Sequence, residues 1–154
     1  WSADAYNVLF PYPRERRVKD YPRAERIVDA ARDRLDRPVE LNAVSGVPHE
    51  EMPSYYNAAD ALLLTSRHEG SPNAVKEAMA CNLPVVSTPV GDVAARLDGV
   101  PHFHVCRSDE ALVAGLVDAL TTDEQIRGRG AVRDIGRRHT GERLLELYRE
   151  VVDS

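Results

Sequence analysis

Residues 68–92, HEGSPNAVKEAMACNLPVVSTPVGD, contain a helix start between two acidic residues. Ser71 is a preferred N-cap residue, and Pro72 suits the first helical position because its missing N–H would have no partner there. We therefore predict a helix that begins at Ser71. Glu69 precedes this start and Glu77 lies within the helix, so the stretch raises the question of what two carboxylates do around a helix N-terminus.

Short apolar runs alternate with segments of helical period on both sides of this stretch. Such alternation predicts βαβ units that build a parallel sheet. The predicted strands are Asn7–Pro11, Val39–Val44, Ala61–Ser66, Pro84–Thr88 and His102–Cys106. Further helices are predicted over Tyr21–Leu35, after Pro53, from Ser108, from Asp123 and over Gly141–Val152. We expect one doubly wound α/β domain, with a parallel sheet of about five or six strands and helices on both faces.

Composition limits the classes of partner. The chain has 154 residues and a formal net charge of -5, which suits a single domain and gives no general attraction to nucleic acid. Cys81 and Cys106 both lie in apolar segments, as expected for buried thiols in a reducing compartment. There is neither an apolar run of about 20 residues nor a signal-peptide pattern. We expect a cytoplasmic protein, and the first residue, Trp1, suggests a segment of a longer chain.

The loop Arg67–Ser71 is the expected position of a ligand site, because ligands of open α/β sheets bind beyond the carboxyl ends of the strands. A helix start offers free N–H groups and the positive end of the helix dipole, which together favour a phosphate. The N–H groups here belong to Ser71, Asn73 and Ala74. Glu77 lies about 7.5 Å beyond Pro72 along the helix axis. Glu69 and Glu77 could then accept hydrogen bonds from hydroxyls of two sugars that flank a diphosphate. The alternative is that both acids are solvated surface residues.

A basic segment, Arg14–Lys19, follows the first predicted strand and therefore reaches the same edge of the sheet. Arginine binds phosphate in a bidentate manner and lysine supplies a compact charge, so the segment could stabilise a departing diphosphate. A solvated basic loop is the alternative, and it is favoured for Arg16 and Arg17. For Arg14 and Lys19 the residues alone leave both interpretations open.

Other kinds of site find little support. His102, His104 and Cys106 alternate on a predicted strand, but no second pair of ligands lies at a usual metal-site spacing. The chain contains no Gly-x-Gly-x-x-Gly, no phosphate-binding P-loop, no Asp-x-Asp pair and no nucleophile-elbow motif. We therefore expect neither a metal nor a cofactor.

Residues 59–93, ADALLLTSRHEGSPNAVKEAMACNLPVVSTPVGDV, resemble the C-terminal half of retaining glycosyltransferases of family four, the group 1 transferases with the two-domain GT-B fold. The shared features are an exposed serine at a strand end, an E-x7-E motif, an EAMA helix and a PVV strand that ends in a glycine turn. The resemblance covers nearly the whole chain, and the fixed order of these features in residues 59–93 makes it specific. It implies a single Rossmann-like domain, residues 1–154, that binds a nucleotide-sugar donor.

The resemblance also implies a role for individual residues. Glu69 would contact the transferred sugar and Glu77 would bind the ribose hydroxyls of the nucleotide. The remaining donor-binding positions would be Gly70, Ser71, Pro72, Asn73, Ala74 and Gly91. Arg14 and Lys19 have the family's five-residue spacing and would neutralise the departing diphosphate without a metal. Pro13 and Asn82 depart from the family, in which both positions are often glycine.

The implied full-length protein is a hexosyltransferase that retains configuration. Its partners would be a nucleotide-sugar donor and the N-terminal acceptor domain, which is absent here, so the isolated domain should transfer nothing. The last helices, residues 122–154, would pack toward that missing domain, which would also carry any peripheral contact with the cytoplasmic face of a membrane. The alternatives are a nucleotide-sugar epimerase of GT-B type and a non-catalytic GT-B-like binding module.

Overall fold

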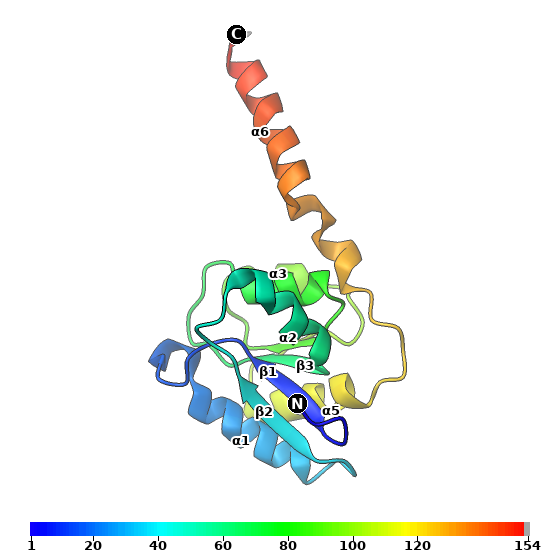
Figure 1. The fold of residues 1–154 in the computed structure, drawn as a ribbon. Helices are drawn as coiled ribbons and strands as arrows, with labels where there is room; N and C mark the ends of the chain where they lie inside the picture. Colours follow the sequence, from blue (N-terminus) through cyan, green and yellow to red (C-terminus); the bar gives the residue numbers. More distant parts are fainter. Residues whose placement is uncertain (153–154) are drawn as a thin grey trace.

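A computed structural model describes residues 1–152 and places a parallel five-stranded sheet at the centre of this part of the chain (Figure 1). The strands lie in the order β2-β1-β3-β4-β5, and every neighbouring pair is parallel. Their bounds are Tyr6–Phe10 for β1, Val39–Ala43 for β2, Ala61–Leu64 for β3, Val85–Ser87 for β4 and His104–Val105 for β5. The predicted α/β class, parallel sheet and flanking helices are confirmed.

Helices cover both faces of the sheet (Figure 1). On one face lie α1 (Tyr21–Arg32) and α5 (Asp109–Thr121). On the other face lie α2 (Met52–Ala58), α3 (Asn73–Ala80), α4 (Val93–Leu97) and the 3-10 helix η3 (Gly128–Ile135). Two short 3-10 helices, η1 (Arg17–Lys19) and η2 (His49–Glu51), precede α1 and α2, and α6 (Arg137–Val152) ends the described chain.

Strand β3 shows why the inner strands read as unbroken apolar runs. All four of its residues are fully buried, and they alternate between the two core clusters. Ala61 and Leu63 face α1 and α5, whereas Leu62 and Leu64 face the helices of the opposite layer. A strand with helices on both faces must be apolar at every position, because successive side chains point to opposite sides.

The direction in which successive strands are added to the sheet reverses between β1 and β3. From β1 the chain moves outward to β2, and it then returns to form β3 on the other side of β1. The loops that follow β1 and β3 meet at this point, where the Arg67 amide donates to the Val18 carbonyl at 2.9 Å. The Thr65 hydroxyl also lies 2.9 Å from the Lys19 carbonyl and 3.0 Å from that of Asp20. This edge is where an open α/β sheet forms a ligand crevice.

The helix predicted to begin at Ser71 begins two residues later. Helix α3 begins at Asn73 with Pro72 in the N-cap position, and the Ser71 hydroxyl instead donates to Asp92 at 2.6 Å. The Ser71 hydroxyl forms a stronger hydrogen bond when it donates to the charged Asp92 carboxylate than when it accepts from a backbone amide, because the bond to the carboxylate is charge-assisted. Ser66, expected to be exposed at the strand end, is buried in the loop that follows β3. By contrast, the helix predicted from Ser108 is confirmed, since α5 begins at Asp109 and the Ser108 side chain accepts from the Ala111 amide.

The C-terminal region differs most from expectation. The helix predicted from Asp123 is absent there: the chain forms η3 at Gly128–Ile135, and the last helix begins at Arg137 rather than at Gly141. Glycines at 128, 130 and 136 disfavour a continuous α-helix. In addition, Gly128 packs so closely against Phe103 and Met79 that a side chain there would collide with them. The strand predicted over His102–Cys106 is present as β5, but its predicted start at His102 is wrong, because this residue has a left-handed backbone and precedes β5.

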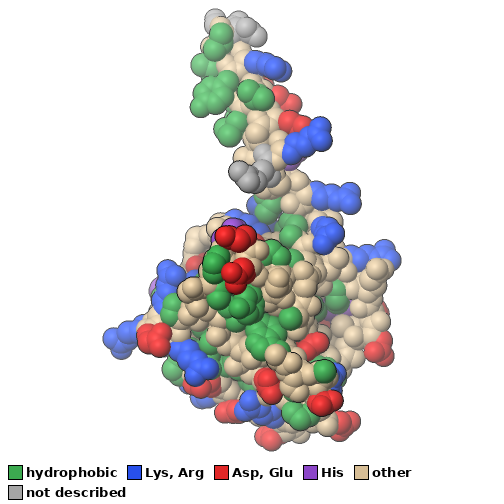
Figure 2. All heavy atoms as spheres, viewed as in Figure 1, with side chains coloured by type: hydrophobic (Ala, Val, Ile, Leu, Met, Phe, Trp, Pro, Cys, Tyr) green, Lys and Arg blue, Asp and Glu red, His purple; other side chains and the backbone are tan. Residues whose placement is uncertain are grey.

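Helix α6 extends away from the rest of the domain and carries apolar side chains along one side (Figures 1 and 2). Its exposed large apolar residues are Leu144, Leu145, Leu147, Tyr148, Val151 and Val152. The end of the predicted domain, residues 153 and 154, lies outside the described residues. Within residues 1–152, no helix combines the length and the apolar character that a bilayer crossing needs.

Candidate functional site

A cavity of about 360 Å³ opens at the carboxyl edge of the sheet, where the loops after β1 and β3 meet. The loop after β1 contributes Pro11, Tyr12, Arg16 and Lys19. The loop after β3 and helix α3 contribute Glu69, Ser71, Pro72, Asn73, Ala74 and Glu77. Met52 and Tyr56 of α2 close the remaining side. The cavity therefore joins a lysine, an arginine, two carboxylates and the first residues of a helix.

Lys19 is the buried cation of this cavity. Its side chain is 4% exposed and forms an ion pair with Glu69, whose side chain is 14% exposed. The Lys19 ammonium also lies 3.6 Å from the centre of the Tyr12 ring. A buried ammonium needs such partners, because water no longer solvates it. Burial, followed by the nearby Glu69 carboxylate, raises the pKa of Tyr12, so this phenol stays neutral.

Glu77 lies on the other side of the cavity and is bound to Tyr56. The Tyr56 hydroxyl donates to Oε2 of Glu77 at 2.7 Å, and His49 Nε2 lies 3.9 Å from Oε1. Burial and the hydrogen bond to Glu77 both raise the pKa of Tyr56, so its hydroxyl keeps the proton that it donates. The two acids of the E-x7-E motif thus face one cavity and differ in their partners.

The turn after β4 supports the loop that carries Glu69. Gly91 has a φ of 54°, and the Asp92 amide donates to the Gly70 carbonyl at 3.1 Å. Asp92 also accepts from Ser71 and from Arg96. Partial burial opposes the shift, but these two hydrogen bonds lower the pKa of Asp92. This carboxylate therefore stays charged and holds the loop in place through its hydrogen bond with Ser71.

The structure brings together most of the residues that the sequence predicts for the site. Lys19, Glu69, Ser71, Pro72, Asn73, Ala74 and Glu77 all line the cavity. Gly70 and Gly91 do not line it: Gly70 lies in the loop that carries Glu69, and Gly91 lies in the turn that supports this loop. Arg14 lies elsewhere: its guanidinium is 5.0 Å from the Tyr21 ring, over a hollow beside α1. Arg16, which the sequence assigned to a solvated loop, lines the cavity instead.

Four further lining residues were not predicted, namely Pro11, Tyr12, Met52 and Tyr56. Pro11 and Tyr12 are the first two residues after β1, so their place beyond a carboxyl end is a signal that the sequence offers. Met52 and Tyr56 come from a helix before β3, and their approach depends on how α2 packs against α3. No spacing in the sequence reports that packing.

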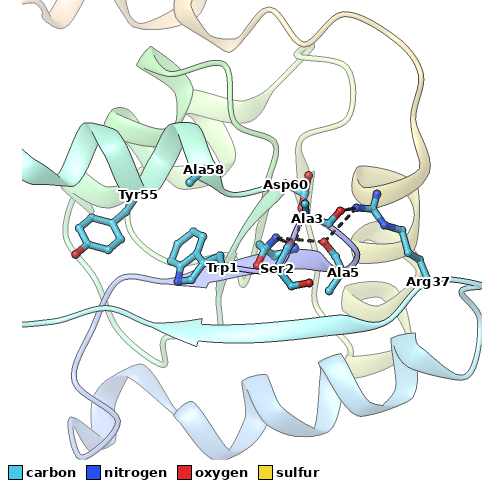
Figure 3. Close-up of a pocket in the computed structure, with 9 residues that line it drawn as sticks. Trp1, Ser2, Ala3, Ala5, Arg37, Tyr55, Ala58 and Asp60 are labelled. Carbon is cyan, nitrogen blue, oxygen red and sulfur yellow. Dashed lines mark hydrogen bonds between the residues drawn. The ribbon is translucent and has the colours of Figure 1, made fainter.

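A second hollow, of about 460 Å³, lies at the opposite edge of the sheet (Figure 3). It is formed by residues that precede strands β1, β2 and β3, by Asn7 near the start of β1, and by Tyr55 and Ala58 of α2. The Trp1 and Tyr55 rings face each other here at 5.8 Å between centres. Arg37 is directed to backbone carbonyls and Asp60 accepts from the Asn7 amide, so both charges already have partners.

His102 and His104 share one carboxylate. His102 Nδ1 and His104 Nε2 lie 3.0 and 2.8 Å from Oδ2 of Asp118, and His102 Nε2 lies 3.2 Å from Glu124. Among the described residues, no three His, Cys, Asp or Glu side chains are grouped as metal ligands. Cys106, the third member of the predicted alternation, is buried and donates to the Ala111 carbonyl.

This arrangement predicts a pH-dependent stability. Hydrogen bonds to Asp118 and Glu124 raise the pKa of His102 above its ordinary value of 6.5. The stabilisation is therefore complete below about pH 6.5 and is lost as the pH rises through the folded-state pKa. We expect His102→Asn to lower the free energy of unfolding in urea more at about pH 5.5 than at about pH 8.5. Asparagine tolerates the left-handed backbone.

The control for this variant is His68→Asn, because His68 is exposed in the loop before Glu69. Its effect on unfolding should not follow the same pH dependence. A His102→Asn deficit that is equal at both pH values would contradict the assignment of the raised pKa to this residue.

Comparison with known proteins identifies the family of the chain. The family model described as "Glycosyl transferases group 1" matches residues 20–123, which is more than half of the chain. A 2-deoxystreptamine N-acetyl-D-glucosaminyltransferase from Streptomyces fradiae is 36% identical over 144 residues. That match covers 88% of this chain and 34% of the relative, so the chain spans about a third of the curated protein's length.

Solved structures support the same fold. Sucrose-phosphate synthase from Thermosynechococcus elongatus superposes with a TM-score of 0.77 at 19% identity, covering 99% of this chain and 47% of the synthase. The pneumococcal O-GlcNAc transferase GtfA, solved with UDP and GlcNAc, gives a TM-score of 0.65 at 14% identity and covers 98% of this chain and 35% of its own. The chain therefore belongs to the group 1 glycosyl transferases and has the fold of the C-terminal, Rossmann-like half of a GT-B protein.

Proposed function

We propose that this domain binds the donor in a glycosyltransferase that moves a sugar from a nucleoside-diphosphate sugar to an acceptor hydroxyl. The observation that carries this proposal is the cavity at the carboxyl edge of the sheet, between β1 and β3. Lys19, Glu69, Glu77 and the start of α3 converge there. Transfer proceeds with retention of configuration and without a metal ion. The acceptor site and the completed reaction belong to a further domain.

The leaving diphosphate requires positive charge, and the cavity has two sources of it. Lys19 is a compact cation on one wall, and the first amides of α3 provide the positive end of a helix dipole on another. Both are held by the fold before any ligand arrives, so they stabilise developing negative charge with little rearrangement. Arg16 also lines the cavity, and its guanidinium could add a bidentate contact to phosphate.

The two carboxylates suit the sugars on either side of the diphosphate. Ionised carboxylates only accept hydrogen bonds, and a vicinal pair of hydroxyls can donate two. Glu77 receives the ribose hydroxyls of the nucleotide, and Glu69 contacts the transferred sugar. Glu69 is paired with Lys19, so each of these two charges has a partner within the fold.

The relatives support a nucleotide-sugar donor. The Streptomyces fradiae protein is named as an N-acetylglucosaminyltransferase, and the pneumococcal transferase was solved with UDP and GlcNAc. An activated hexose is therefore the donor class that we propose for this domain. A hexosyl donor also agrees with the two-acid arrangement, since hexoses present hydroxyls to Glu69.

The acceptor-binding half is the partner that we propose for α6. Leu145 and Tyr148 of this helix are 57% and 67% exposed, and the apolar side chains gather on one side of it (Figure 2). Relatives extend well beyond the matched region, which is 34% of the Streptomyces fradiae protein. Packing of α6 against that additional polypeptide would remove this apolar surface from water.

The direct test is a calorimetric or NMR titration of the domain with UDP, GDP and ADP in parallel, with and without magnesium. We expect one nucleotide to bind saturably, with the same affinity in both conditions. Glu77→Ala should weaken this binding by about tenfold or more, because it removes two charge-assisted hydrogen bonds. Glu146→Ala, on exposed α6, is the matched control and should bind like the parent. Equal binding by the Glu77→Ala variant would overturn the assignment of this residue.

A further inference from the structure

The two oxygens of the Glu77 carboxylate have different surroundings. Oε2 accepts a hydrogen bond of 2.7 Å from the Tyr56 hydroxyl. Oε1 faces the imidazole of His49 at 3.9 Å, beyond hydrogen-bond distance, and the His49 side chain is 82% exposed. The buried Tyr56 thus holds Oε2, whereas Oε1 lies beside the cavity and makes no hydrogen bond to His49.

Tyr56 is a firm anchor for this contact. Its side chain is 2% exposed and belongs to the same core cluster as Val75 and Met79 of α3, the helix that carries Glu77. The ring cannot change position without disturbing that core. A hydrogen bond from a fixed neutral hydroxyl to a carboxylate is short and strong, so it restricts rotation of the carboxylate as well.

We propose that Tyr56 is a positioning residue that holds Glu77 so that Oε1 remains directed to the ribose hydroxyls of the donor nucleotide. This inference rests on the proposed function, because it needs Glu77 to bind ribose. Tyr56 does not touch the diphosphate or the transferred sugar in this arrangement. It sets how strongly the site prefers a ribonucleotide over a nucleotide that lacks the ribose hydroxyls.

The neighbouring tyrosine provides a matched control. Tyr55 lies on the same helix but is directed to the opposite edge of the sheet, where its ring faces Trp1 (Figure 3). Tyr55→Phe and Tyr56→Phe each remove one hydroxyl from α2 and leave the ring in place. Only the second removes a hydrogen bond to Glu77.

The experiment compares four proteins with the parent: Tyr56→Phe, Tyr55→Phe, Glu77→Ala and the double variant Tyr56→Phe/Glu77→Ala. Affinity is measured by NMR titration for the preferred nucleoside diphosphate and for its 2′,3′-dideoxy analogue. We expect Tyr56→Phe to weaken ribonucleotide binding about three- to tenfold, the range that pre-ordering of one side chain provides. Binding of the dideoxy analogue should be unchanged, and Tyr55→Phe should match the parent for both.

In the Glu77→Ala background, Tyr56→Phe should have no further effect, since the two residues act as one unit. Equal losses for both nucleotides would assign Tyr56 a packing role only and would overturn the proposal. So would a Tyr56→Phe loss that persists without Glu77, or no loss where Glu77→Ala weakens binding. If instead Glu77→Ala binds like the parent, the assignment of Glu77 to the ribose fails, and with it the role of Tyr56; if no nucleotide binds, the proposed function itself fails. Urea unfolding of each variant confirms that it remains folded.

Discussion

Replacement of Lys19 by methionine should weaken nucleotide binding and also destabilise the domain. The substitution keeps most of the side-chain volume but removes the buried ammonium that pairs with Glu69. Loss of one partner from a buried ion pair leaves the other charge uncompensated. We expect the free energy of unfolding in urea to fall by about 3 kcal/mol, the low end for such pairs, because Glu69 keeps some contact with water. Affinity for the nucleoside diphosphate should fall by at least about tenfold.

A second substitution separates the two effects. Glu69→Gln in the Lys19→Met background removes the uncompensated charge, so it should recover part of the lost stability. It should not recover nucleotide binding, because the cation beside the diphosphate is still missing. Lys76 is the only other lysine of the sequence and lies partly exposed on α3, so Lys76→Met is the matched control. If Lys19→Met binds the nucleotide as the parent does, Lys19 has no part in the donor site.

The sequence predicts the sheet well because the signals for it are local. Each inner strand is a short run that must be apolar on both faces, as Ala61–Leu64 illustrates, and each run is separated from the next by a segment of helical period. Once the strands are parallel, their carboxyl ends share one edge. The positions of Lys19, Glu69 and Glu77 at that edge then follow from the order of the elements.

The parts that the sequence does not predict depend on contacts between distant elements. Tyr56 reaches Glu77 because α2 packs beside α3, across 21 positions of the chain. Ser71 bonds to Asp92 rather than capping its own helix, because a carboxylate from another turn lies within reach. The choice between Arg14 and Arg16 is of the same kind: both belong to one basic segment, and only the path of the loop decides which of them faces the cavity.

The prediction of a helix from Asp123 is wrong for a related reason. The stretch from Asp123 contains residues that suit a helix, but Gly128 fits against Phe103 and Met79 where a larger residue would collide. Tertiary packing therefore selects a 3-10 helix at Gly128–Ile135 over the locally plausible α-helix. Helix α6 follows only after this segment, at Arg137.

Gly91→Ala should be the most disruptive single methyl addition near the site. Gly91 has a left-handed backbone, and a Cβ there would overlap the carbonyl oxygen of Gly70 and lie 2.6 Å from its carbonyl carbon. Both atoms belong to backbone, so the collision can be relieved only by moving the loop that carries Glu69. We expect a loss of about 1 kcal/mol from the left-handed conformation, and a further 1 to 3 kcal/mol from the collision.

Gly99→Ala isolates the first of these two costs. Gly99 has a similar φ of 69°, and a Cβ there would meet no atom within 4 Å. Its unfolding free energy should therefore fall only by the conformational cost, with nucleotide binding unchanged. The Gly91 variant should lose more stability and also bind the nucleotide less tightly, because a displaced loop separates Glu69 from Lys19. Equal losses of stability in the two variants, with binding intact in both, would show that the loop yields freely and that the contact between Gly91 and Gly70 does not position the donor site.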